Sequence, residues 1–270
     1  MEVFGYAAAI LTGMALGLLG AGGSVLTMPT LVYLFGVEPV LATAYSLFVV
    51  GLTALGGASG YFRRGWIDFR AVVGFGVPSI VGVIFARRYV IPSLPDSLAI
   101  GWGISLTKDS LIMVAFALLM LGAGFAMVRD RSERYLLTDD QSLSRRSSAW
   151  HFLVAAEGLV VGLITGIVGA GGGFLIVPGL VLLVGLPVRK AIGSSLTIIA
   201  AKSLLGSANE IAAFSSVEWG FLLKFCLATS VGMGIGIGLT RFVSPHGLRK
   251  SFGALILFMG ATILASEFLQ

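Results

Sequence analysis

The sequence is poor in charge and contains almost no cysteine or histidine. Only 11% of its 270 residues are charged, and it has one cysteine and two histidines. Soluble domains are roughly 25% charged. The single cysteine, Cys226, excludes a disulfide framework within the chain, and no His, Cys and carboxylate cluster has the spacing of a metal site. Neither a nucleophile elbow nor a phosphate-binding loop occurs, so we predict no enzyme, metal or cofactor.

Long stretches of the chain lack charge altogether. No Lys, Arg, Asp or Glu occurs in residues 3–37 or 158–188, which are runs of 35 and 31 residues. A spanning helix needs about 20 apolar residues, so each run is too long for one span and short for two. The chain is therefore predicted to lie in a lipid bilayer, with a short helix beside a full span in each run.

Charges, prolines and glycines divide the chain into ten apolar segments. Their approximate ranges are 3–20, 24–36, 39–61, 71–91, 110–128, 151–169, 173–186, 190–213, 219–240 and 248–268. As helices, segments 24–36 and 173–186 would span about 20 Å, which is less than the roughly 30 Å of a hydrocarbon core. The predicted fold class is an all-α polytopic membrane protein in which these two segments are short or broken.

An internal repeat relates the two halves of the chain. Residues 17–29, GLLGAGGSVLTMP, return 149 positions later as residues 166–178, GIVGAGGGFLIVP, with seven identities. A period this long indicates two related halves and not a solenoid. We divide the chain into a first membrane repeat (1–128), a linker (129–148) and a second membrane repeat (149–270). Five segments per half make the second repeat inverted, which is the geometry of alternating-access transporters.

The basic residues predict an orientation in the membrane. Thirteen Lys and Arg residues fall in one set of alternating loops, and the other set holds three, namely Arg87, Arg88 and Lys108. The positive-inside rule places the first set and the linker in the cytoplasm, and both termini in the periplasm. Basic residues between spans form no stripe, so no nucleic-acid partner is expected. The sequence does not distinguish a monomer from a homodimer.

Two readings apply to the repeated glycines. Small residues four apart let membrane helices pack closely, and we prefer this interpretation for Gly13, Gly17 and Gly20 and for their copies Gly162, Gly166 and Gly169. Consecutive glycines break a helix, and the helix that follows presents free N–H groups and a positive dipole end to an anion. We therefore expect two such helix starts to converge on one anion near the middle of the membrane. The residues expected there are Gly22, Gly23, Ser24, Gly171, Gly172 and Gly173.

Several polar residues lie within the apolar segments. Tyr45, Ser46, Ser194 and Ser195 occupy repeat-related positions, where their hydroxyls either contact a ligand or bond back to the helix. Lys202 stands deep in segment 190–213, where a charge costs at least about 2.5 to 3.5 kcal/mol, so we expect it to contact an anion or to snorkel. Glu210 either pairs with Lys202, carries a proton or lies at the interface, and Glu157 is a second candidate for proton coupling.

The chain resembles the TauE/SafE family of sulfite-exporter-like transporters. The resemblance rests on the doubled glycine motif with Pro29 and Pro178, on the Ala-x-x-x-Ser-Leu elements at 42–47 and 191–196, and on residues 61–68, YFRRGWID. It implies proton-coupled secondary transport of a small sulfur-containing anion, such as sulfite, thiosulfate or a sulfonate like sulfoacetate, across a bacterial inner membrane. Tyr45 departs from the family's usual Thr-Ser-Leu pattern. The alternatives from other classes are an anion channel and a membrane scaffold that transports nothing.

Overall fold

The computed structural model describes the chain except residues 1, 20–23, 96, 101–103, 130–147, 170, 183, 214–216, 240–244 and 270. Before the linker, the helices are α1 (Glu2–Leu19), α2 (Ser24–Pro29), the π-helix η1 (Thr30–Leu34), α3 (Pro39–Arg63), α4 (Phe69–Phe85), the π-helix η2 (Ala86–Val90), α5 (Ile91–Ser93) and α6 (Lys108–Arg129). After it come α7 (Ser148–Val168), α8 (Gly173–Leu182), α9 (Val188–Ala213), α10 (Trp219–Leu239) and α11 (Pro245–Leu269).

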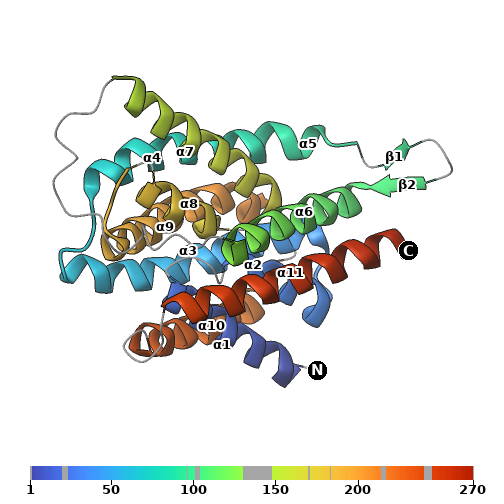
Figure 1. The fold of residues 1–270 in the computed structure, drawn as a ribbon. Coiled ribbons are helices and arrows are strands. Elements are labelled where there is room, and N and C mark those ends of the chain that lie inside the picture. The colour runs from blue at the N-terminus through green and yellow to red at the C-terminus, as the bar shows by residue number, and fades with distance from the viewer. Residues whose placement is uncertain are drawn as a thin grey trace.

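These helices match the ten predicted segments, with ends that differ by a few residues. Two strands were not predicted from the sequence. β1 (Ser97–Ile100) and β2 (Ile104–Thr107) pair antiparallel, with Ser97 opposite Thr107. They form a small hairpin between α5 and α6 that projects from one end of the helix bundle (Figure 1). The prediction of an all-α polytopic membrane protein is confirmed, with this hairpin as its only strand pair among the described residues.

Five helical stretches are long and apolar enough to cross a membrane. They are Pro39–Arg63, Phe69–Ser93, Lys108–Phe125, Arg189–Ala208 and Trp219–Leu239. The outward faces of α4 and α10 are apolar at a spacing of four residues, as a helix face in lipid requires. At least 46% of each of these side chains is exposed: Val73, Val77, Val81 and Phe85 on α4, and Leu223, Leu227, Val231 and Ile235 on α10. A soluble surface rarely carries such continuous apolar rows.

Each half packs its first helix against the fourth helix of the other half. The first helix of the early half, α1, packs along the fourth helix of the later half, α10, and the reverse pair, α7 with α4, packs in the same way. The third helices α3 and α9 pack against each other, and so do the last helices α6 and α11 (Figure 1). A two-fold relation between the halves produces this pattern, because each contact then recurs with the partners exchanged.

The equivalent helices α3 and α9 run in opposite directions. Arg189 at the start of α9 stacks on Trp66, which follows the end of α3. At the other end, Tyr45 near the start of α3 bonds to Glu218, which follows α9. The N- and C-termini both lie at the end of the bundle that carries the hairpin (Figure 1). The second half is therefore inverted relative to the first, as five segments per half predict.

The two short helices end in the same way. The Val37 N–H donates to Leu31 O at 3.1 Å, and the Leu186 N–H donates to Leu180 O at 3.0 Å. These residues are related by the offset of 149 positions, so the repeated sequence forms a repeated backbone structure. Pro29 does not end the first short helix, because α2 continues through it into η1 and the turn comes at Gly36.

Glycines allow the helices of the α1–α10 and α4–α7 pairs to pack closely. A β-carbon at Gly13 or Gly17 would meet backbone atoms of α10, at Thr229 and Met233 respectively. On the other pair, a β-carbon at Gly162 would meet the Ser79 carbonyl, and one at Gly166 would lie 2.8 Å from Ala86 Cβ. The packing interpretation of these four glycines is confirmed. Gly20 lies outside the described residues.

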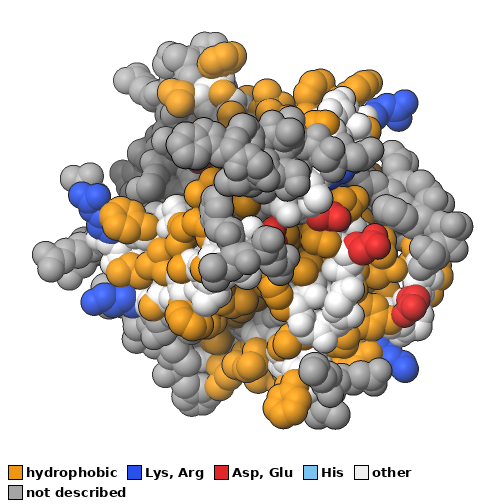
Figure 2. All heavy atoms as spheres, turned by 90° about the vertical axis from the view of Figure 1, so that its right-hand side faces the viewer, with side chains coloured by type: hydrophobic (Ala, Val, Ile, Leu, Met, Phe, Trp, Pro, Cys, Tyr) orange, Lys and Arg blue, Asp and Glu red, His pale blue; other side chains and the backbone are white. Residues whose placement is uncertain are grey.

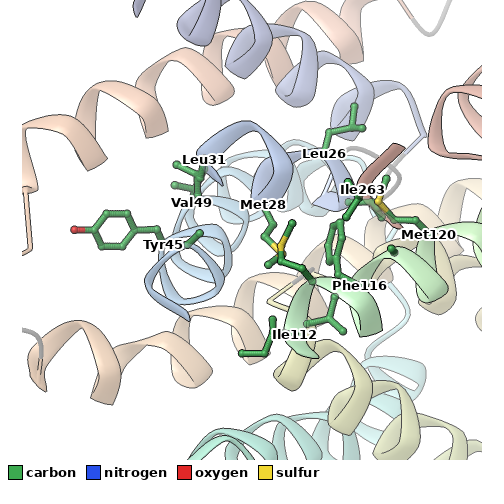
Figure 3. Packing of buried hydrophobic residues seen from close by; sticks show 14 of the residues in the cluster. Leu26, Met28, Leu31, Tyr45, Val49, Ile112, Phe116, Met120 and Ile263 are labelled. Carbon is green, nitrogen blue, oxygen red and sulfur yellow. The ribbon is translucent and has the colours of Figure 1, made fainter. Parts of the chain in front are cut away.

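The α2 part of the first short helix is completely enclosed. All six residues of α2 are buried. Leu26 and Met28 pack with Phe116 and Met120 of α6 and with Ile263 of α11 (Figure 3). Because α6 and α11 cover α2 from outside, its first residue, Ser24, is enclosed by protein.

Candidate functional site

The starts of the two short helices meet at the crossing of α3 and α9. A β-carbon at Gly171 would contact Val50 on α3, and it would lie 3.1 Å from Ile199 Cγ2 and 3.2 Å from Ser24 Cβ. Ser24 is fully buried at the first position of α2. The structure thus brings Ser24 and Gly171 together near the centre of the bundle. Gly22 and Gly23, which were predicted at the same site, lie outside the described residues.

A fully buried lysine lies at this meeting point. Lys202 of α9 is 0% exposed, and its ammonium donates to Thr165 Oγ1 of α7 at 2.8 Å. The Thr165 hydroxyl in turn donates to Gly162 O at 3.3 Å. An ammonium has three donors, and in the described part of the chain Thr165 is its only partner. A snorkelling lysine would reach toward water, so this geometry does not support the snorkelling interpretation.

The helix break at Gly172 lies directly beside Lys202. Gly172 has a φ of 70°, a left-handed conformation that residues with a β-carbon adopt only at a cost. A β-carbon there would contact Thr165 and would lie 2.9 Å from Lys202 Nζ. Helix α8 begins at the next residue, Gly173, and the N–H groups of Leu175 and Ile176 both bond to Gly172 O. The positive end of this ten-residue helix and the ammonium therefore act in the same place.

Four buried serine hydroxyls have no hydrogen-bond partner among the described residues: Ser46, Ser79, Ser195 and Ser203. Ser46 and Ser195 are repeat equivalents, one turn before the central Val50 and Ile199. Ser203 follows Lys202 directly. Ser79 lies on α4 between Gly76 and Val83, which pack against Ile198 and Gly206 on either side of Lys202. A buried hydroxyl without a partner costs about 1 to 3 kcal/mol, so these donors are suited to a ligand.

Tyr45 and Ser194 lie away from the centre and hold connections between helices. The Asp68 N–H donates to Ser194 Oγ at 2.8 Å, and the Glu218 N–H donates to the Tyr45 hydroxyl at 3.2 Å. Asp68 precedes α4 and Glu218 precedes α10, so the two bonds are repeat equivalents. The Tyr45 hydroxyl points away from the packed cluster in Figure 3. The Ser194 and Tyr45 hydroxyls therefore accept hydrogen bonds from backbone N–H groups at opposite ends of the bundle.

Of the two acidic candidates, Glu157 and Glu210, the structure describes the side chain of Glu157 alone. Glu157 of α7 lies against α8, where a β-carbon at Gly179 would lie 2.5 Å from Glu157 Oε1. Its other oxygen, Oε2, is buried and has no hydrogen-bond partner in the described residues. The side chain of Glu210 lies outside the described part of the chain, so its predicted pairing with Lys202 stays a prediction.

The sequence analysis missed three polar residues near the centre, namely Thr165, Ser79 and Arg87. Arg87 was counted among the loop residues opposite the linker, and this was wrong. It is 6% exposed within η2, and its Nη1 donates to Thr43 Oγ1 at 3.0 Å. Arginine near the end of an apolar segment is typical of a loop, and only the packing of η2 against α7 shows that Arg87 is enclosed.

The two ends of the bundle carry opposite charge. At one end, the guanidinium groups of Arg64 and Arg189 lie 5.4 and 5.2 Å from the ring centre of Trp66. At the other end, Glu38, Glu218 and Tyr45 line a hollow of about 420 Å³. Figure 2 views the molecule from the end with the hairpin and the termini, and it shows acidic side chains near the middle of this face.

An inverted repeat, apolar outer faces and the starts of two short helices that meet beside a buried cation define a polytopic membrane transporter. The chain belongs to the family described as sulfite exporter TauE/SafE, whose model matches residues 6–263.

The relatives cover nearly the whole chain. A probable membrane transporter protein of Xylella fastidiosa (strain 9a5c) is 30% identical over 257 residues, covering 94% of this chain and 91% of the relative. The probable membrane transporter protein YjnA of Bacillus subtilis is 26% identical over 265 residues, covering 94% and 96%. A third, from Methanocaldococcus jannaschii, is 22% identical over 274 residues, covering 94% of each chain. No solved structure matches the chain.

Proposed function

We propose that this protein transports a small sulfur-containing oxyanion across the bacterial inner membrane by alternating access around Lys202. The observation that supports this most strongly is the fully buried ammonium, whose only partner in the described residues is the Thr165 hydroxyl. An uncompensated charge inside protein is strongly destabilising, and a bound anion would compensate it. The α8 start at Gly173 and the buried serine hydroxyls supply further donors without adding a fixed positive charge.

The inverted repeat supports a carrier over a channel. In alternating access, two inverted halves exchange conformations around a fixed central site. Ser24, Gly171 and Lys202 lie where the halves meet, at the α3 and α9 crossing. A channel would instead need a continuous polar path, and a scaffold would have no need of a buried cation.

The charges at the two ends support export. Arg64 and Arg189 lie on the end that the positive-inside rule assigns to the cytoplasm, where they would gather anions. Glu38 and Glu218 lie at the opposite mouth, where they would discourage a released anion from binding again. The family description, sulfite exporter, agrees with this direction.

Glu157 is our candidate for proton coupling. A buried carboxylate is costly when ionised and can be neutralised by a proton. Its Oε1 lies against Gly179 of α8, and its Oε2 is buried and has no hydrogen-bond partner among the described residues. Glu157 contacts α8, the short helix that begins at the Lys202 site. Protonation of Glu157 would therefore change the contact that it makes with α8.

Ligand-dependent thermal stability of the purified protein tests the function. A ligand that binds only the folded state stabilises it by RT ln(1 + [L]/Kd), about 2.7 kcal/mol at one hundred times Kd. We expect sulfite, thiosulfate or sulfoacetate to raise the melting temperature, and taurine, which is zwitterionic, to have less effect. Lys202→Met should weaken binding at least tenfold, because a hydrogen bond to a charged group contributes about 1.5 to 3 kcal/mol.

Lys224→Met is the matched control, because Lys224 is an exposed lysine on α10. If Lys202→Met binds the anion as the parent does, the central site is wrong.

In vesicles, a carrier should show flux that saturates with anion concentration and accelerates with anion on the far side. Flux that rises in proportion to concentration would instead support a channel, and no flux would support a scaffold.

A further inference from the structure

The short connection between α3 and α4 carries two exposed aromatic rings beside two exposed arginines. Phe62 lies near the end of α3 and Phe69 begins α4, and their side chains are 60% and 59% exposed. The two ring centres lie 6.2 Å apart, with the ring planes at 85°. An exposed arginine directly follows each ring in the chain, Arg63 after Phe62 and Arg70 after Phe69. This connection lies at the end of the bundle opposite the hairpin (Figure 1).

Both rings continue helix faces that lie toward lipid. Phe69 comes four residues before Val73, so it extends the apolar row of α4 by one turn. Phe62 comes two turns after Leu55, which is 51% exposed on α3. A β-carbon at Gly60 would meet no atom within 4 Å, so the protein leaves the helix surface beside the rings uncovered. The ring pair therefore lies where acyl chains reach the end of the bundle that the positive-inside rule assigns to the cytoplasm.

Contacts with α9 hold the connection in place. The Asp68 N–H donates to Ser194 Oγ at 2.8 Å. The guanidinium groups of Arg64 and Arg189 lie 5.4 and 5.2 Å from the ring centre of Trp66. The connection is thus fixed at both its middle and its end, and two of the basic residues at this end of the bundle are used in holding it. The other two arginines of the connection extend from a defined backbone.

No acidic side chain compensates these two arginines. Neither Arg63 nor Arg70 forms an ion pair with a described residue. The one acid of the connection, Asp68, caps α4, because its Oδ1 accepts from the Ala71 N–H at 2.9 Å. A guanidinium presents a planar fork of donors that matches the oxygens of a phosphate. A ligand that fits both the forks and the rings therefore carries a phosphate and an apolar chain.

We propose that the connection between α3 and α4 binds an anionic phospholipid of the cytoplasmic leaflet. The head group binds at Arg63 and Arg70, and an acyl chain packs on Phe62 and Phe69. Basic sites at the cytoplasmic ends of membrane helices recognise anionic head groups by this combination of charge and apolar surface. The lipid site goes beyond the proposed function and does not depend on which anion is transported.

Two phospholipids with the same acyl chains test the site. Phosphatidylglycerol carries a net negative charge, whereas phosphatidylethanolamine is zwitterionic. Native mass spectrometry of delipidated protein in detergent measures the affinity for the first lipid bound. We expect the parent protein to bind phosphatidylglycerol at least tenfold more tightly than phosphatidylethanolamine. Equal affinities, or no binding of either lipid, would overturn the proposal.

Variants assign the preference to the arginines. Arg63→Gln with Arg70→Gln should weaken phosphatidylglycerol binding at least tenfold and leave phosphatidylethanolamine nearly unchanged, because each basic residue at an anionic lipid surface strengthens binding about fivefold. Arg88→Gln with Lys224→Gln is the matched control, since it removes two exposed positive charges at the opposite end of the bundle. The control should keep the preference. A preference that survives in the first variant, or that the control loses equally, would show that net charge and not this connection selects the lipid.

The rings should contribute to both lipids alike. Phe69→Ala removes apolar surface without changing charge, so it should weaken both lipids several-fold and keep their ratio. Phe258→Ala, which changes a 68% exposed phenylalanine on α11, should leave both affinities unchanged. Equal effects of Phe69→Ala and Phe258→Ala would mean that no acyl chain packs on the ring pair, and would overturn the site as drawn.

The lipid site and the central anion site fail separately. Lys202→Met should keep the preference for phosphatidylglycerol, because Lys202 is fully buried away from the membrane surface. If Lys202→Met weakens binding of the transported anion while the parent does not distinguish the two lipids, the proposed function stands and the lipid site is wrong. If the parent prefers phosphatidylglycerol while Lys202→Met binds the anion normally, the lipid site stands and the proposed function is wrong.

Discussion

Val50 and Ile199 lie against the same residue, Gly171, although they belong to different halves of the chain. They are repeat equivalents, separated by the offset of 149 positions. A residue that contacts both members of an equivalent pair lies close to the axis that relates the halves. The polar residues around it are not equivalent, however, because Lys202 on α9 corresponds to Thr53 on α3. Thr53 shares a hydrogen bond of 2.9 Å with Thr229, so the second half alone supplies the central charge.

Replacing Thr165 should remove the hydrogen-bond partner of the Lys202 ammonium and leave its charge in place. Thr165→Val keeps the shape and removes the only described acceptor of the Lys202 ammonium. We expect a loss of stability of about 1 to 3 kcal/mol, because a charged donor loses a buried partner. Bound anion should recover part of this loss, so the ligand-induced rise in melting temperature should be larger than in the parent. Thr165→Ser, which keeps the hydroxyl, should behave as the parent in the same melts.

Removing an unpartnered serine hydroxyl should have opposite effects on stability and on binding. Ser46→Ala and Ser195→Ala delete buried donors that have no described partner, so the free protein should become no less stable. If these hydroxyls contact the anion, its affinity should fall several-fold in each variant. Ser194→Ala is the contrasting case, because Ser194 accepts from the Asp68 N–H at 2.8 Å. It should lower the melting temperature and leave affinity unchanged, and unchanged affinity in Ser46→Ala and Ser195→Ala would remove both from the site.

A side chain at Gly172 should disable the site. Gly172→Ala places a β-carbon 2.9 Å from Lys202 Nζ in a left-handed conformation that costs roughly 1 to 2 kcal/mol. We expect anion affinity to fall more than tenfold and the melting temperature to fall as well. Gly234→Ala is the control, since that glycine lies in α10 with open space around it, and alanine should be neutral or stabilising there. Normal binding by Gly172→Ala would show that the anion does not lie at this helix start.

The repeat predicted much of this architecture from the sequence, because equivalent sequences form equivalent structures. Its offset of 149 positions relates Leu31 to Leu180, whose carbonyls accept equivalent bonds at the ends of the short helices, and it predicted that the second half is inverted. The rotation of each helix about its axis is set by packing and could not be predicted. Neighbouring residues on α9 therefore differ, with Ser194 at a connection and Ser195 unpartnered. Arg87 was misassigned for the same reason, since burial of a charge at a segment's end depends on the helix packed beside it.

The orientation in the membrane can be tested with single cysteines. In a Cys226→Ala background, Ser142→Cys in the linker should resist a membrane-impermeant thiol reagent in intact cells and react after lysis. Glu38→Cys, at the exposed opposite mouth, should react in intact cells. Cys226 itself is 3% exposed, so its removal should have little effect on labelling. Ready labelling at position 142 together with protection at position 38 would reverse the orientation and the direction of transport that we propose.

Neutralising Glu157 should separate anion binding from proton coupling. Glu157→Gln keeps the contact with α8 at Gly179 and cannot lose a proton. Glu157 lies eight residues before Thr165 on α7, which is about 12 Å along the helix, so we expect anion affinity to change less than threefold. Exchange of anion across vesicles with equal pH on both sides should continue, whereas accumulation driven by a pH gradient should fall at least tenfold. Glu267→Gln, which changes a carboxylate at the far end of α11, should keep both activities. Accumulation that persists in Glu157→Gln would exclude this residue as the coupling site and would leave Glu210 as the remaining candidate.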